Sequence, residues 1–176
     1  QQRFRMAGHP PSDHFRIKHD CPSLDDGLLD LIDRWTQTVT KPSTVIIDTA
    51  GRVLPTKRSK SGNAYENDTA IWAPLQSMAL NHGIAVIALT HLTKESRDDD
   101  WLKNIQSSTG FTGVADTIIC LERQRNEPRG RLRATGRDIE EVDRPLHFDS
   151  KRGRWSFATN QLRSELTPER QLIIDL

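Results

Sequence analysis

The sequence has little of what marks secreted or membrane-bound proteins. It contains only two cysteines, Cys21 and Cys120, and their spacing fits neither a metal site nor a redox motif. It also has no run of eighteen apolar residues and no segment that resembles a signal peptide. We therefore expect a reduced, cytoplasmic protein that makes no membrane contact, in which Cys120 is a small core residue of an apolar strand.

An excess of charge of either sign is also absent. The chain of 176 residues carries 25 lysines and arginines against 24 aspartates and glutamates, for a formal net charge of +1. This balance excludes binding of nucleic acid through the overall charge, so any such contact must come from local basic patches. The length is sufficient for one domain with a real core.

The third absence is a nucleotide-binding motif. The phosphate-binding loop G-x-x-x-x-G-K-[ST] does not occur, and residues 57–63, the nearest basic stretch with a glycine, do not fit it. Residues 1–6 read as the end of a helix that is already under way. We therefore interpret the chain as a fragment whose N-terminal part is missing.

Three apolar stretches are present that predict strands buried on both faces. They cover residues 44–49, 84–90 and 116–121, and we expect them to be adjacent in one mostly parallel sheet. Asp48 closes the first stretch and His91 follows the second. Since ligands bind beyond the carboxyl ends of such strands, both side chains should lie close together at that edge. The alternatives are a carboxylate that caps the next turn and a histidine that merely ends a strand.

Apolar residues at helical spacing predict two helices that cover the sheet. The first extends from Ser23, a predicted N-cap, to about Trp35 and has one apolar face. The second begins near Glu66, and Pro74 inside it predicts a kink. Residues 14–18 alternate in polarity and predict a short strand before the first helix.

The pattern changes after residue 126. Short alternating runs separated by turns predict an antiparallel extension of the sheet, with strands at residues 130–135, 144–148 and 154–157. Short helices are predicted at residues 107–113 and after residue 167. The predicted fold class is therefore α/β, a mostly parallel sheet flanked by helices, with an antiparallel extension near the C-terminus.

Two long polar segments, residues 51–64 and 92–106, contain little apolar sequence that could anchor them. We expect them to be loops that are mobile in the absence of nucleic acid. Their basic side chains either grip the phosphates of a nucleic acid or are simply solvated. These basic residues are Arg52, Lys57, Arg58, Lys60 and Lys94.

Four stretches together carry a resemblance to a known family: residues 45–49, 82–94, 110–116 and 135–141. In this order and spacing they resemble the RecA-like motor core. The resemblance is to one branch of it, the phage- and plasmid-type AAA-family ATPases related to the RepA hexameric replicative helicase. It covers most of residues 1–160. It implies that residues 161–176 are a linker and the first helix of a following winged-helix-like module.

The resemblance implies roles for three residues. Asp48 would be the magnesium carboxylate, which usually holds the ion through water. His91 would sense the γ-phosphate, although the family often has two consecutive histidines where this chain has Thr90 and His91. Arg137, in a Gly-Arg-Asp turn, would reach the nucleotide of the next subunit and neutralise charge in the transition state. The alternative for Arg137 is a turn arginine on a solvated hairpin.

The resemblance further implies a DNA helicase or helicase loader of DNA replication, with ATP and Mg²⁺ as ligands. Single-stranded DNA would contact both loops, and the full protein would form a hexameric ring. The family's phosphate loop, first strand and catalytic glutamate would lie before residue 1, so this chain alone should be inactive.

Two other hypotheses belong to different classes. One is a catalytically inactive RecA-like module that binds DNA or a partner. The other is an unrelated hydrolase that uses Asp48 and His91 as an acid–base pair. The hydrolase ranks last, because the sequence offers it neither a nucleophile nor a metal cluster.

Overall fold

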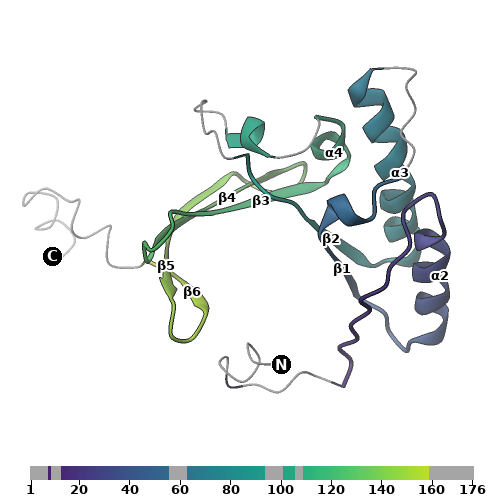
Figure 1. Ribbon diagram of the computed structural model, residues 1–176, viewed down its shortest axis with the longest axis horizontal. Coiled ribbons are helices and arrows are strands. Elements are labelled where there is room, and N and C mark those ends of the chain that lie inside the picture. Colours follow the sequence, from purple (N-terminus) through teal and green to yellow (C-terminus); the bar gives the residue numbers. More distant parts are fainter. Residues whose placement is uncertain (1–7, 9–12, 56–62, 94–100, 106–108, 159–176) are drawn as a thin grey trace, which may run out of the picture. The chain divides into compact units, whose positions relative to one another are not determined.

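The structure is a computed structural model that describes residues 8, 13–55, 63–93, 101–105 and 109–158. The chain divides into two compact units, Ile17–Ala115 and Asp116–Leu176 with Gln1–Arg16 (Figure 1). No helix in the described ranges is both long enough and apolar enough to cross a membrane. The helix predicted after residue 167, and with it the winged-helix-like module, lies outside the described residues.

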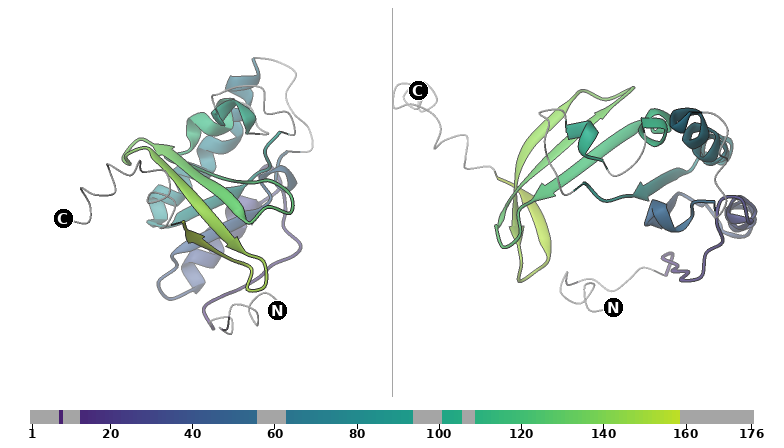
Figure 2. Two further views of the ribbon diagram at one scale, coloured as in Figure 1. Left: turned by 90° about the vertical axis from the view of Figure 1, so that its left-hand side faces the viewer. Right: turned by 45° about the horizontal axis from the view of Figure 1, so that its top comes forward.

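Among the described residues, the first unit contains three α-helices and a two-stranded sheet (Figure 2). Helix α2 is Leu28–Thr38, helix α3 is Ala64–His82, strand β1 is Thr44–Asp48 and strand β2 is Ala85–Leu89. The two strands pair in parallel, from Thr44 opposite Ala85 to Asp48 opposite Leu89. The predicted parallel pairing of these two apolar stretches is therefore confirmed.

The core of this unit lies between the helices and one face of the sheet. Leu28 and Ile32 of α2 and Leu75 of α3 are buried against Ile47 of β1. Full burial of such a side chain contributes about 1.5–3 kcal/mol, so each of these residues contributes substantially to the stability of the unit. The predicted apolar faces of both helices are confirmed.

The other face of β1 and β2 corrects the prediction that these strands are buried on both sides. Burial alternates along both strands, and Ile46, Ile87 and Leu89 are 56%, 47% and 42% exposed. The physical reason is that α2 and α3 both contribute to the core on the same face, the one that carries Ile47. An unbroken apolar run indicates a strand, but it does not show how many of its faces are covered.

Helix α2 begins later than predicted. Residues 24–27 form turns, and Gly27 precedes the helix at φ 100°, a left-handed conformation that interrupts helical hydrogen bonding. The Ser23 hydroxyl donates to the Asp25 carboxylate instead of capping the helix. The prediction of Ser23 as N-cap is therefore wrong, and so is the predicted strand at residues 14–18, which has no regular structure.

Helix α3 is continuous over 19 residues, including Pro74. Its N-cap is Asn63, whose side-chain oxygen accepts a hydrogen bond of 2.8 Å from the Glu66 backbone N–H. The predicted start at Glu66 is thus three residues past this cap. The short helix α4 (Thr109–Val114), close to the predicted residues 107–113, packs on α3.

The second unit is an antiparallel sheet of four strands in the order β3-β4-β5-β6. They are Thr117–Arg123, Arg129–Gly136, Val142–Asp149 and Arg154–Phe157. The predicted antiparallel strands near the C-terminus are confirmed. The prediction that residues 116–121 join the parallel sheet is wrong, since β3 pairs with β4, Ile119 opposite Ala134. The fold is therefore mixed α/β, with a small parallel sheet and a four-stranded antiparallel sheet.

Candidate functional site

The carboxyl edge of the parallel sheet carries the two residues that the sequence singled out. Asp48 is the last residue of β1 and pairs with Leu89, and His91 follows Leu89 by two residues. Both Asp48 and His91 are exposed. The parallel register therefore brings both residues to one edge of the sheet, as predicted. The Asp48–Thr49 peptide bond is cis.

The chain that leaves β1 is anchored soon after this edge. Residues Ala50–Arg52 form the 3₁₀ helix η1, in which the Arg52 N–H donates to the Thr49 carbonyl at 3.0 Å. Val53 is 3% exposed, and its carbonyl accepts from the Leu24 N–H at 2.8 Å. The prediction that this segment has no apolar anchor is thus wrong for its first residues.

The segment that leaves β2 is closed at its base. Leu92 forms an antiparallel bridge with Ile105, and the Thr93 N–H donates to the Asn104 carbonyl at 2.7 Å. The Thr93 hydroxyl donates to the same carbonyl at 3.2 Å. Asn104 and Ile105 are buried. This segment also has an apolar anchor that its polar composition did not predict.

Of the five basic residues predicted to contact nucleic acid, the structure places one. Arg52 lies in η1, is exposed, and follows Asp48 by four residues. Its position puts a positive charge near the carboxyl edge of the sheet. The other four residues, Lys57, Arg58, Lys60 and Lys94, lie outside the described residues.

Asp48 is the carboxylate that the described residues place at this edge, and it limits the metal chemistry open to them. Among the described residues, no three His, Cys, Asp or Glu side chains come together as a metal site. A Ca²⁺ or structural Zn²⁺ site needs several protein ligands, which Asp48 alone does not supply. Mg²⁺ keeps most of its water and often uses one or two carboxylates with substrate phosphates, and an exposed Asp48 fits that mode.

Arg137 directly follows β4, a strand of the antiparallel sheet. Its backbone N–H donates to the Asp116 carbonyl at 3.0 Å, and its guanidinium Nη1 lies 3.3 Å from Asp116 Oδ1. The two side chains are 59% and 55% exposed. An ion pair so exposed is worth at most about 1 kcal/mol, so it orients Arg137 weakly.

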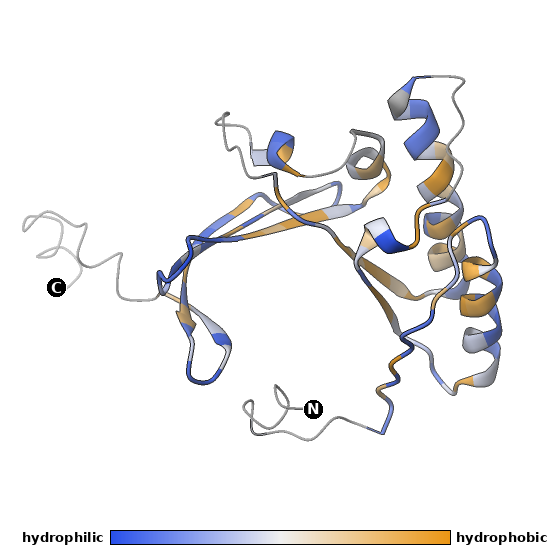
Figure 3. Cartoon of the chain, viewed as in Figure 1, coloured by the Kyte–Doolittle hydropathy of each residue, from blue (hydrophilic) through white to orange (hydrophobic). Residues whose placement is uncertain are grey.

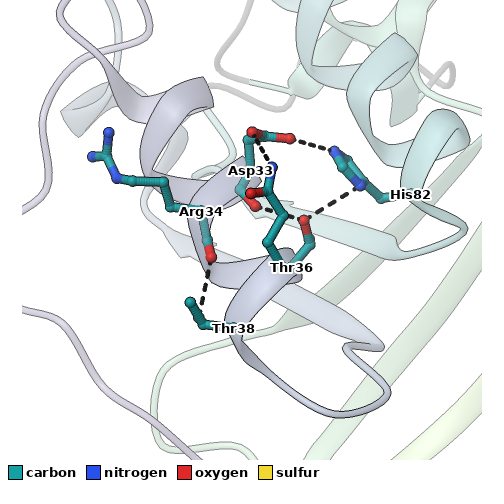
Figure 4. A network of polar contacts seen from close by, with 6 residues as sticks. Asp33, Arg34, Thr36, Thr38 and His82 are labelled. Carbon is teal, nitrogen blue, oxygen red and sulfur yellow. Dashed lines mark hydrogen bonds and ion pairs between the residues drawn. The ribbon is translucent and has the colours of Figure 1, made fainter.

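Polar side chains of α2 and α3 form a network that the sequence did not predict (Figure 4). His82 Nε2 lies 2.9 Å from Asp33 Oδ1, and His82 Nδ1 lies 3.3 Å from the Thr36 hydroxyl. The Thr36 hydroxyl donates at 2.7 Å to the Asp33 carbonyl, so its hydrogen is already engaged. Gln37 donates to the other Asp33 carboxylate oxygen at 2.7 Å. The network therefore joins two helices and offers no poised nucleophile.

No sequence signal could have located this network, because its two sides come from different helices. His82 is 46 positions from Thr36. His82 also stands in the last turn of α3, where a histidine is common for local reasons. The contact depends on the packing of α2 on α3, which the sequence pattern predicts only as a meeting of apolar faces.

Comparisons with known proteins assign this chain to no family. No protein-family model matches the chain, and no curated protein matches it in sequence.

Proposed function

We propose that this chain is part of a RecA-like ATP-dependent DNA motor of the type related to the phage and plasmid RepA helicases. In this proposal the carboxyl edge of β1 and β2 faces the nucleotide. The observation that carries the proposal is the parallel register of the two strands, with Asp48 opposite Leu89 and His91 two residues beyond. In this proposal the carboxylate at the sheet edge is placed to hold Mg²⁺, and the imidazole beside it to contact a phosphate, as the resemblance implies.

The two residues have different roles in this proposal. Asp48 holds Mg²⁺ through its water shell, for which one exposed carboxylate is enough. When bound, the ion neutralises phosphate charge. His91 donates a hydrogen bond to a phosphate oxygen from the neighbouring strand. The chain has no phosphate-binding loop, so another polypeptide segment would supply the backbone amides and the lysine that cradle the triphosphate.

The proposal also assigns the basic residues. Arg52, together with Lys57, Arg58, Lys60 and Lys94, contacts the backbone of single-stranded DNA. Arg137 acts on the nucleotide of a neighbouring subunit in a homo-oligomeric ring. The exposed ion pair between Arg137 and Asp116 contributes little free energy, so Arg137 can leave it for a phosphate. This supports the assignment.

The test compares this chain with a longer polypeptide that also carries a phosphate-binding loop. Nucleotide affinity and steady-state ATP hydrolysis are measured for both. The chain alone should neither bind ATP tightly nor hydrolyse it. In the longer polypeptide, Asp48→Asn should lower turnover by about 100-fold or more. Asp30→Asn, at an exposed position of α2, is the matched control and should leave turnover unchanged.

The outcome separates the competing functions. A longer polypeptide that binds single-stranded DNA without any ATP turnover would favour the catalytically inactive RecA-like module. Robust ATP hydrolysis by residues 1–176 alone would contradict the need for a separate phosphate loop. Equal turnover in Asp48→Asn and Asp30→Asn would remove Asp48 from the site.

A further inference from the structure

Hydrophobic and hydrophilic residues are interspersed along the strands of the antiparallel sheet β3–β6 (Figure 3), and the pairing of the strands sorts them onto two unlike faces. Strand pairing places Leu121 beside Leu132, Leu146 beside Phe157, and Phe148 beside Trp155, all on one side. We call this side the apolar face, and define it by Ile119, Leu121, Leu146, Phe148, Trp155 and Phe157. It also carries Arg123, opposite Gly130, and Arg144, opposite Leu132.

The opposite face is richer in charged side chains, and four of them pair within the sheet. Arg131 donates two hydrogen bonds of 2.6 Å to the Asp143 carboxylate. These hydrogen bonds hold the pKa of Asp143 below its usual range. Arg133 pairs with Glu122 on the same side.

The apolar face is incompletely covered. Its residues at the two outer strands are the most open: Ile119 is 67% exposed, Leu121 47% and Phe157 61%. Between them, Ala134 and Leu146 are buried. Three large apolar side chains on one face of a sheet are a patch of the kind that marks interaction surfaces.

The charges on this face specify what it can bind. Within strands β3 to β6, the apolar face carries two exposed arginines and no carboxylate, since Glu122, Asp143 and Asp149 lie on the polar side. An occupant must therefore be apolar where it covers the two outer strands, and should carry acidic groups that reach Arg123 and Arg144. A basic or uniformly polar partner does not fit.

The aromatic rings argue against a nucleic acid as this occupant. The Arg123 guanidinium lies 4.5 Å over the Phe148 ring, and the Phe148 and Trp155 ring centroids are 4.8 Å apart. Trp155 also covers Gly130, where an added Cβ would lie 2.5 Å from the indole. Base stacking needs an open ring face. Of the three aromatic residues on this face, Phe157 has the exposed ring. The other exposed apolar side chains of the face, Ile119 and Leu121, are aliphatic.

We propose that the apolar face of β3–β6 binds an amphipathic α-helix of a partner protein. Four strands span about 14 Å, a distance that a helix crossing the strands covers with about ten residues at 1.5 Å each. The apolar stripe of the helix covers Ile119, Leu121 and Phe157. Glutamates or aspartates beside the stripe pair with Arg123 and Arg144.

The probe that tests this proposal is a fluorescein-labelled synthetic helix of about 18 residues. It has leucine at i, i+3, i+4 and i+7 with glutamate beside the stripe, and a second version has lysine in place of glutamate. Fluorescence anisotropy should show saturable binding of the glutamate peptide. Leu121→Asp should weaken that binding about tenfold, as expected when a charge replaces an exposed apolar side chain that the helix covers.

Charge reversal is the decisive readout. Arg144→Glu should weaken the glutamate peptide about fivefold and strengthen the lysine peptide, whereas loss of fold would weaken both. Arg154→Glu, an exposed position on the polar face, is the control and should change neither affinity. Circular dichroism and urea unfolding establish that each variant is folded. If Leu121→Asp fails to fold, Leu121→Ala takes its place.

Three results would overturn the proposal. The first is equal binding of the glutamate and lysine peptides, or no saturable binding of either. The second is binding of a single-stranded oligodeoxynucleotide that Leu121→Asp and Arg144→Glu abolish, which would assign the face to nucleic acid. The third is a concentration-dependent dimer in sedimentation that Leu121→Asp abolishes, which would assign it to a second copy of the chain.

Discussion

Gly110 shows how a single residue determines the distance between two helices. A Cβ at this position would lie 2.5 Å from the Tyr65 carbonyl oxygen and 2.9 Å from the Asp68 Cβ. Neither atom belongs to the end of a flexible side chain, so α4 would have to move away from α3. The edge-to-face contact of Trp72 and Phe111, at 4.7 Å between centroids, depends on the same close approach.

We therefore expect Gly110→Ala to lower the free energy of unfolding by about 1–3 kcal/mol, the usual cost of overpacking. Urea denaturation measures it. Gly51→Ala is the matched control, because its nearest neighbour is the Thr49 hydroxyl at 4.0 Å, an ordinary contact. Equal stability of the two variants would show that α4 is free to shift.

Cys120 is the second residue with a measurable consequence. Burial raises the pKa of its thiol to about 11 from an ordinary value of 9.0, with a further contribution from Glu122. Between these values the unfolded chain loses the thiol proton and the folded chain keeps it, so stability falls as pH rises. Below pH 9 the contribution is fully present.

Urea unfolding at about pH 8 and about pH 10 tests this linkage. The wild-type protein should lose more stability between the two pH values than Cys120→Ala, which has no thiol to ionise at that position. Cys21→Ala, at an exposed cysteine, should behave like the wild type. A Cys120→Ala variant with the same pH dependence as the wild type would refute the assignment.

At the scale of secondary-structure elements, helix α3 contains a local conflict. Pro74 has no N–H to donate within the helix, yet α3 continues for eight residues beyond it. The residues around Pro74 explain why: Trp72 and Leu75 are each 5% exposed and belong to the core of the first unit. Tertiary burial of this turn outweighs the missing hydrogen bond.

Replacement of the exposed Pro74 by alanine should therefore stabilise the protein by about 1–3 kcal/mol. The greater conformational entropy of the unfolded chain without proline reduces this gain. Thermal unfolding measures the change. Ser77→Ala, at an exposed position in the same helix, should stay within about 0.5 kcal/mol of the wild type. A destabilised Pro74→Ala variant would mean that the proline ring itself contributes to packing.

For the whole molecule, the proposed motor function predicts complementation between subunits. In a polypeptide with a phosphate loop, Arg137→Ala should lower turnover by about 10³-fold or more but largely spare nucleotide affinity. An arginine that acts in trans stabilises the transition state more than the ground state. A mixture of Arg137→Ala and Asp48→Asn subunits should regain some ATPase activity, since some interfaces then have both groups intact.

Steady-state ATPase assays of each variant and of the mixture, with nucleotide binding measured in parallel, provide the test. Arg154→Ala is a suitable control, because Arg154 is exposed on β6 of the same sheet and belongs to neither proposed site. Wild-type turnover in Arg137→Ala would show that Arg137 has no role in catalysis and only pairs with Asp116 on a solvated hairpin. A mixture as inactive as its components would exclude action in trans.

The sequence by itself determined the features that depend on neighbouring residues. Apolar periodicity located the buried faces of α2 and α3, and the apolar runs located β1, β2 and β3. The positions of Asp48 and His91 after such runs were enough to bring them to one edge, once the two strands paired in parallel. Alternation and turn residues were enough to predict the antiparallel strands, because hairpin pairing is local in the chain.

Only the tertiary structure decided which groups distant in sequence meet. It paired β3 with β4, left one face of β1 and β2 exposed, joined His82 to Asp33, and placed Arg137 beside Asp116. The physical reason is that apolar burial has no direction and a strand offers the same hydrogen-bonding groups to either neighbour. A run of apolar residues therefore predicts that a strand is buried, and the packing of the whole chain selects its partner and its covered face.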